Sequence, residues 1–323
     1  MTLSQLRSFL TVARLGSVKE AARSLEVSEP AVSGAVRLLR RELGDELYLR
    51  AGGTIELTPG GRRLASAASE ILGLADHAAW AVREAATDTT TLRVAVTPAV
   101  AEFAADLLLE AFGHRYPGIK ASVQVAPGTH FARLVTDRTV DIALGPRAGG
   151  VAEPDIVCEP FLRYRLLVVA APGHALADST AVAPAALVGT PWLLGPSEED
   201  PSTESGAFLT RQAIAARRTH TFPNYAAALA QVVAGRGITL AISHTVRDEL
   251  DHGALCVLDV RGTPIHGTWY TSTLPAHRRT EGAEHLRHFV TLPDTTRVLL
   301  SRRGGISSER FRARAPMQAG RRT

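Results

Sequence analysis

The sequence contains very little cysteine. Its 323 residues include two, Cys158 and Cys256, which are far apart in the chain. Two thiols are too few for the disulfide framework of a small secreted protein, and their separation is not that of a zinc motif. We therefore expect neither a disulfide scaffold nor a cysteine-based metal site.

Long apolar runs are missing as well. No stretch approaches the roughly 18 uninterrupted apolar residues that a membrane-spanning helix needs. Residues 1–16 are amphipathic and lack the apolar block and cleavage site of a secretory signal. These absences predict a cytoplasmic protein with no membrane contact.

The usual catalytic motifs do not occur. There is no Gly-x-Ser-x-Gly elbow and no phosphate-binding loop. His285 and His288 lie about one helical turn apart beside Glu281 and Glu284, a spacing that suits a metal but is also typical of a solvated polar helix. We expect no enzyme, no cofactor and no metal.

What the chain does have is length and an ordinary apolar content. At 323 residues and 45% hydrophobic residues, two or three folding units are expected. The net charge of +4 is unevenly placed, since residues 301–323 alone hold seven arginines and one glutamate. This segment has no periodicity, which predicts a basic disordered tail that either attracts phosphate or is inert.

The N-terminal residues 1–58 show three helical segments. Residues 3–14 carry one apolar face, Ser17 opens a short helix with the capping-box partner Glu20, and Ser28 opens a third helix that Gly44 ends. Two short helices with a tight turn between them have the dimensions of a helix-turn-helix, although a plain three-helix bundle shows the same leucine spacing.

The next segments favour the helix-turn-helix. Residues 46–50 and 54–57 are strand-like and are joined by Ala-Gly-Gly, a turn signal. Together they predict a small wing after the third helix.

A long helix is predicted from Pro59 to about Ala86. Its apolar positions recur every three or four residues, as in a coiled coil; they are Leu64, Ala67, Ile71, Leu74, Ala78 and Val82. Such a helix spans roughly 40 Å, which is more than a sixty-residue module covers. We expect a homodimer through residues 59–86, followed by a linker to residue 91.

From Leu92 the pattern changes to alternating strands and helices. Strands are predicted at 92–96, 121–126 and 140–144, with helices between them, and further strands follow from residue 165 onward. This order predicts an open, mostly parallel α/β sheet.

Several motifs resemble those of the LysR-type transcriptional regulators. In the N-terminal part they are the Ala21-Ala22 pair, the run Ser28-Glu29-Pro30-Ala31-Val32-Ser33, and Leu57-Thr58-Pro59-Gly60. Later in the chain they are Tyr116-Pro117-Gly118, Asp141-Ile142-Ala143-Leu144-Gly145 and Gly235-Arg236-Gly237-Ile238. The resemblance covers about residues 1–293 and leaves out the tail.

The resemblance implies an architecture. Residues 1–58 would form a winged helix-turn-helix, 59–91 a linker and dimerisation helix, and 92–300 a two-lobed effector domain like a periplasmic binding protein. Lobe I would comprise about 92–161 and 268–300, and lobe II about 162–267. The dimers would assemble further into a homotetramer.

The same resemblance implies that the chain binds double-stranded DNA with the third helix in the major groove. Glu29, Pro30, Ser33 and Arg37 would then face base edges or phosphates. Three further residues are expected to contact phosphates, namely Lys19, Arg50 and Thr58. Glu29 departs from the family, which commonly has glutamine there, so the operator is expected to differ.

A small-molecule effector is expected at the carboxyl ends of the effector-domain strands. Thr97 follows the first strand, Gly128 and Thr129 the second, and Gly145 and Arg147 the third. From lobe II the resemblance adds Ser197 and Asn224. Hydroxyls and free N–H groups at helix starts suit an organic acid or another anion.

One alternative from a different class is a solute-binding protein of the same two-lobed fold without DNA function. The missing signal sequence and the N-terminal helix-turn-helix both argue against it. The sequence does not select the effector, the regulated genes or the sign of regulation.

Overall fold

The computed structural model describes residues 1–51, 54–84, 89–149, 155–214 and 218–300. The predicted basic tail, 301–323, therefore lies outside the described residues. The chain divides into two compact units, Met1–Asp88 with Thr136–Thr139 and Thr89–Val135 with Val140–Thr323. In the described part of the chain, no helix is long and apolar enough to cross a membrane.

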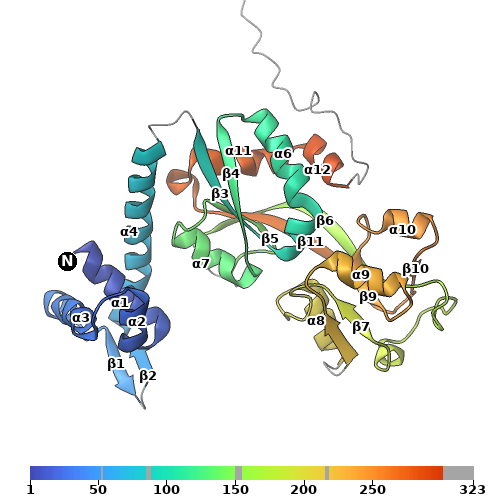
Figure 1. Ribbon diagram of the computed structural model, residues 1–323, viewed down its shortest axis with the longest axis horizontal. Coiled ribbons are helices and arrows are strands. Elements are labelled where there is room, and N and C mark those ends of the chain that lie inside the picture. The colour runs from blue at the N-terminus through green and yellow to red at the C-terminus, as the bar shows by residue number, and fades with distance from the viewer. Residues whose placement is uncertain (52–53, 85–88, 150–154, 215–217, 301–323) are drawn as a thin grey trace, which may run out of the picture. The chain divides into compact units, whose positions relative to one another are not determined.

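The first unit begins with three helices (Figure 1). They are α1 (Leu3–Leu15), α2 (Val18–Ser24) and α3 (Glu29–Leu43). The Ser17 and Ser28 side chains cap α2 and α3, and Gly16 and Gly44 end α1 and α3 with φ of +64° and +66°, a conformation that glycine adopts without strain. The helix boundaries expected from these signals are confirmed.

The capping box expected at α2 is only half formed. The Ser17 hydroxyl accepts from the Glu20 amide, but the Glu20 carboxylate accepts from Arg23 instead of returning to the cap. The Arg23 guanidinium is a charged donor, so the Glu20 carboxylate binds it in preference to the neutral backbone amide of Ser17. A complete capping box occurs at α1, between Thr2 and Gln5.

A two-stranded wing follows, built from β1 (Tyr48–Ala51) and β2 (Thr54–Leu57) in antiparallel register. Arg40 of α3 holds this wing in place. Its guanidinium lies 4.3 Å from the centroid of the Tyr48 ring and donates to the Tyr48 carbonyl oxygen at 3.0 Å. The winged helix-turn-helix predicted from the sequence is confirmed.

The long helix is α4, Pro59–Glu84. The predicted apolar seam lies on its surface: Leu64 is half-buried, and Ala67, Ile71, Leu74, Ala78 and Val82 are exposed. Leu74 and Val82 expose 54% and 75% of their surface.

The second unit is organised by one mixed seven-stranded sheet. Its strands are β3 (Thr90–Val96), β4 (Ile119–Val125), β5 (Ile142–Gly145), β6 (Val157–Ala170), β9 (Thr239–Ile242), β10 (Cys256–Val257) and β11 (Ile265–Thr273). The pairs β3–β4 and β3–β5 are parallel, whereas β11–β5, β11–β6, β10–β6 and β6–β9 are antiparallel. The expectation of a mostly parallel sheet is wrong, because the long strands β6 and β11 pair antiparallel across the middle.

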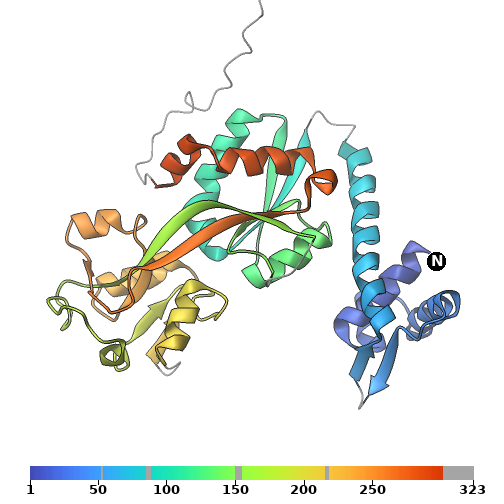
Figure 2. The ribbon, with the colours of Figure 1, turned by 180° about the vertical axis from the view of Figure 1, so that it is seen from behind.

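These two strands connect the lobes (Figure 2). Their register shifts between Trp269 and Tyr270, where Phe161 of β6 is the extra residue. Such a bulge bends and twists a pair of strands. It lies at the positions where the chain was expected to pass between lobes.

Helices cover both faces of lobe I (Figure 1). The segment after β3 is helical throughout, as α5 (Pro98–Val100), the π-helix η1 (Ala101–Ala105) and α6 (Asp106–Arg115); α11 (Glu281–Val290) and α12 (Pro293–Leu300) pack with it. The helix α7 (Phe131–Thr136) covers the opposite face.

Lobe II contains short elements that the sequence pattern did not reveal. They are β7 (Trp192–Leu194), β8 (Thr219–Thr221), α8 (Glu204–Arg211) and α10 (Arg247–Asp251); the expected helix near 225–234 is α9 (Tyr225–Val233). The strands β7 and β8 have three residues each, too few for a periodic signal.

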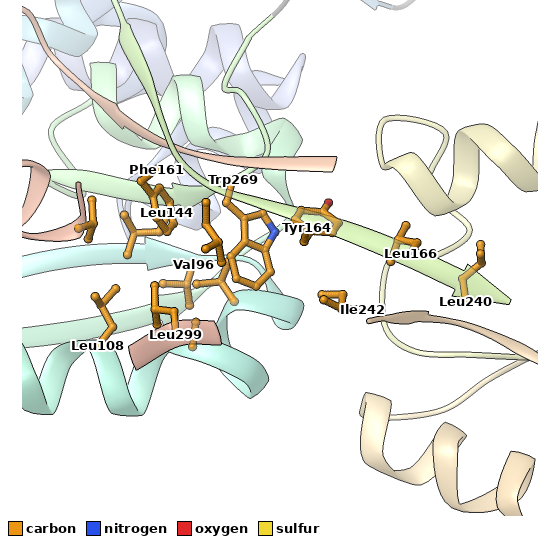
Figure 3. Packing of buried hydrophobic residues seen from close by; sticks show 14 of the residues in the cluster. Val96, Leu108, Leu144, Phe161, Tyr164, Leu166, Leu240, Ile242, Trp269 and Leu299 are labelled. Atoms are coloured by element: carbon orange, nitrogen blue, oxygen red, sulfur yellow. The ribbon is translucent and has the colours of Figure 1, made fainter. Parts of the chain in front are cut away.

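The main core runs from lobe I into lobe II (Figure 3). Val96 and Leu144 belong to the lobe I side, and Leu240 and Ile242 to the lobe II side. Trp269 lies between them beside Tyr164, with the ring centroids 5.3 Å apart.

We expect Gly267→Ala to destabilise this junction. A Cβ at Gly267 would overlap the Tyr164 ring, so either the ring or the strand must shift. Overpacking of this kind costs about 1–3 kcal/mol. Thermal unfolding should show a lower Tm, whereas Gly173→Ala, where a Cβ meets open space, should leave it unchanged; equal values for both variants would contradict the expected overlap.

Candidate functional site

The N-terminal end of α3 faces solvent on one side. Glu29, Pro30 and Arg37 are exposed and Ser33 is half-buried. The other side of the helix is buried in the core of the first unit through Val32, Val36 and Leu39. The four residues expected to face DNA therefore share the side of α3 that the fold leaves accessible.

Three basic side chains around this helix are available to phosphates. Lys19 of α2, Arg37 of α3 and Arg50 of β1 are exposed and pair with no carboxylate among the described residues. Arg23 and Arg40 differ, because they pair with Glu20 and Glu46 at 2.8 Å and 3.1 Å.

Thr58 makes two hydrogen bonds within the first unit. Its hydroxyl donates to the Asp45 carboxylate at 2.7 Å and accepts from the Gly61 amide at 2.8 Å. The hydrogen bond from Thr58 is the main cause of a lowered pKa of Asp45. By accepting from Gly61 the Thr58 side chain caps α4, and its own donor is used by Asp45. The expected phosphate contact at this cap stays a prediction.

A cavity with a volume of about 300 Å³ lies between the lobes of the second unit. Thr97, Gly128 and Ser197, all expected at the effector site, line it. Strand ends from both lobes thus meet here, which is where open α/β sheets bind ligands.

Four expected residues lie outside this lining. Thr129 and Arg147 are exposed and directly follow the lining residues Gly128 and Pro146 in the chain. Gly145 is buried where a Cβ would meet Phe131 and Thr97. The Asn224 carboxamide accepts from the Ala227 amide at 2.7 Å and caps α9. Strand-end position alone was too coarse to distinguish residues inside the cavity from their neighbours.

Several lining residues were missed by the sequence analysis. Glu102 and Glu198 have no motif around them, and Tyr164 and Trp269 are ordinary residues of the strands β6 and β11. Glu102 belongs to the π-helix η1, a distortion frequently found at functional sites. Nothing in the sequence pattern distinguishes that turn from the regular helix around it.

Glu102 connects the two lobes across the cavity. Its carboxylate oxygens accept from the backbone amides of Tyr225 at 2.8 Å and Ala226 at 2.6 Å. These are the first free N–H groups of α9, where the helix dipole favours negative charge. The chain thereby supplies its own anion to this helix end.

Glu198 is the most deeply buried carboxyl group of the lining, with 4% of its surface exposed. It accepts from the Gly195 amide at 2.6 Å. Burial, opposed by this hydrogen bond and assisted by the charge of Glu102, raises the pKa of Glu198 to about 8.

The tyrosines of the cavity are held as neutral hydrogen-bond donors. Tyr164 donates to Glu204 at 2.8 Å and Tyr225 donates to the Pro196 carbonyl oxygen at 2.9 Å. Burial first, and neighbouring carboxylates second, raise the pKa of both phenols well above the usual range.

His285 and Glu284, two of the residues whose spacing suits a metal, have other contacts. The His285 ring stacks on Tyr116 with centroids 4.5 Å apart, and Glu284 is paired with Arg279 and Arg287. Across the described ranges, no group of three or more histidine, cysteine or acidic side chains is arranged to hold a metal ion.

Known proteins resemble both units. Residues 3–62 match the family model of the bacterial regulatory helix-turn-helix protein, lysR family, and residues 85–292 match the LysR substrate binding domain. An uncharacterized HTH-type transcriptional regulator of Mycobacterium tuberculosis is 38% identical over 97% of both chains. The HTH-type transcriptional regulator CfxR of Cupriavidus necator is 30% identical over 95% of this chain and 96% of its own.

Solved structures show the same fold. A variant of full-length OxyR from Pseudomonas aeruginosa superimposes with a TM-score of 0.57 at 19% identity, over 92% of this chain and 97% of that one. ArgP from Mycobacterium tuberculosis also gives a TM-score of 0.57, at 22% identity over 89% and 95% of the two chains. With a helix-turn-helix and a substrate-binding domain both matched along its length, the chain belongs to the LysR family of transcriptional regulators.

Proposed function

We propose that the protein binds a promoter operator and that a small molecule in the interlobe cavity modulates this binding. In this proposal residues 1–58 bind DNA, 59–91 link and dimerise, and 92–300 hold the effector. The protein would act in the cytoplasm, where the DNA is. The observation that carries it is the combination, on one chain, of an accessible α3 with free basic side chains and a two-lobed domain with a cavity of about 300 Å³.

The lining of the cavity does not favour an organic acid as the effector. The cavity lining contains Glu102, Glu198 and Glu204, and Arg147, the cation expected to bind an anion there, does not line it. A carboxylate ligand would therefore enter a negatively charged site without a compensating side chain.

We further propose a homodimer through residues 59–86 and a homotetramer made of two such dimers. Support for the dimer comes from the seam of α4, whose aliphatic side chains Ile71, Leu74 and Val82 are exposed in the single chain. A row of such residues at coiled-coil spacing is normally covered by a partner helix.

The DNA part is tested by Ser33→Ala and Arg37→Ala. A lost base contact costs about 1–3 kcal/mol, so operator affinity should fall by about 5- to 150-fold. If Arg37 contacts only phosphate, binding to all sequences should weaken alike, and the salt slope should drop by about one. Mobility-shift titrations at several salt concentrations measure both quantities.

Arg236→Ala is the matched control, because Arg236 is an exposed arginine of the second unit. It should bind the operator as the wild type does. Wild-type affinity of both α3 variants would mean that DNA contacts another face. A protein without any sequence-specific, salt-sensitive DNA complex would instead support the alternative of a solute-binding protein.

A further inference from the structure

The charge of the interlobe cavity is one-sided. Of the described residues that line it, none is lysine, arginine or histidine, and five are acidic; these are Glu102, Glu198, Asp200, Glu204 and Glu249. Carboxyl groups gathered around a cavity of low dielectric, with Glu198 among them once it ionises, favour a cation and repel an anion.

The position that would best bind an anion is already occupied. The N-terminus of α9 points two backbone amides into the region between the lobes, and the Glu102 carboxylate accepts from both. The next amide is satisfied by Asn224. An anionic ligand would have to displace a carboxylate of the protein itself.

The cavity instead offers oxygen acceptors. One oxygen of the buried Glu198 accepts from Gly195, and its other oxygen has no protein partner within the described ranges. Glu204 likewise uses one oxygen, for the Tyr164 hydroxyl. A ligand with N–H donors and positive charge would donate to the second carboxyl oxygen of Glu198 and of Glu204.

The remaining wall is aromatic and aliphatic. The Tyr164 and Trp269 rings lie 5.3 Å apart, and those of Phe103 and Tyr225 lie 5.2 Å apart. Aromatic faces attract ammonium and guanidinium groups, and a neighbouring Leu240 suits a short methylene chain.

We propose that the interlobe cavity selects a small cationic molecule, an aliphatic amine or guanidine, whose charged group binds between Glu198 and Glu204. The inference rests on the proposed function, in which this cavity is the effector site. Glu102 contributes by closing the end of α9 to anions and by adding negative charge.

The test is isothermal titration of the full chain at pH 8 with putrescine, agmatine and succinate. The two cations should bind, and succinate, a dicarboxylate of similar length, should give no heat. With a pKa of about 8 in the empty cavity, Glu198 is about half ionised at pH 8, and a bound cation would favour its ionised form. Glu198→Gln cannot ionise but keeps the shape, so the loss of a charge-assisted hydrogen bond should weaken cation binding at least about tenfold. Glu199→Gln, an exposed neighbour outside the lining, should bind as the wild type does.

A second variant should gain affinity for the anion. Glu102→Ala frees the two amides of α9, so this variant should gain succinate binding and lose part of its cation affinity. Succinate binding by the wild type, absence of binding by both cations, or equal cation affinity in Glu198→Gln and wild type would each overturn the inference.

Operator binding measured on the same samples separates the two proposals. A protein that forms a specific DNA complex but binds neither cation loses only the assignment of the ligand. A protein that binds cations in a Glu198-dependent way but forms no specific DNA complex retains this inference and loses the proposed function.

Discussion

The double variant Ile71→Glu/Leu74→Glu is expected to sediment as a monomer, and the wild type as the proposed dimer or tetramer. Both side chains lie in the exposed seam of α4, with 38% and 54% of their surface exposed in the single chain. Two charges in a coiled-coil seam would be buried against a partner without compensation.

The affinity for the operator should fall when the dimer is lost. Two tethered DNA-binding units gain about 10²- to 10⁴-fold in affinity from simultaneous binding, and a monomer loses this gain. We therefore expect a loss of at least about 100-fold in a mobility shift. Ser66→Glu, at an exposed position outside the seam, should keep the wild-type mass; monomers from this control, or unchanged sedimentation of the double variant, would contradict the seam as the interface.

Glu198→Gln is expected to stabilise the protein in alkaline but not in acidic solution. Burial raises the pKa of Glu198 from 4.5 to about 8 in the folded chain. As the pH rises from 4.5 to 8 the unfolded chain loses this proton first, so the folded state is progressively disfavoured. At 1.36 kcal/mol per pKa unit, the cost reaches about 5 kcal/mol above pH 8 and vanishes near pH 4.

The glutamine variant cannot ionise, although its amide oxygen can still accept from Gly195. Its Tm should exceed that of the wild type by about 10 °C or more at pH 9, since each kcal/mol shifts a unit of about 200 residues by about 2–4 °C. At pH 4.5 the two should unfold together. Glu199→Gln is the control for surface charge, and a difference between Glu198→Gln and wild type that does not change with pH would contradict the buried, protonated carboxyl group.

The first unit was predictable because its signals are local. A serine cap, a left-handed glycine and apolar residues three or four positions apart act within one or two helical turns, so Ser17, Ser28, Gly16 and Gly44 were enough to place α1 to α3. The seam of α4 has the same origin. Even so, the partner of Glu20 was decided by competition with Arg23, which a capping motif does not include.

Which residues line the cavity depends on the tertiary structure. Glu102 and Glu198 are 96 residues apart, and they meet only because β6 and β11 run antiparallel through both lobes and bring η1 opposite α9. Short-range patterns in the sequence predicted three helices with a wing, a long apolar seam and alternating strands and helices, whereas the DNA-binding and effector roles were implied by the resemblance to the LysR family. The negative charge of the cavity and the occupied end of α9 depend on which distant side chains converge, because burial and hydrogen bonding between them exist only in the folded chain.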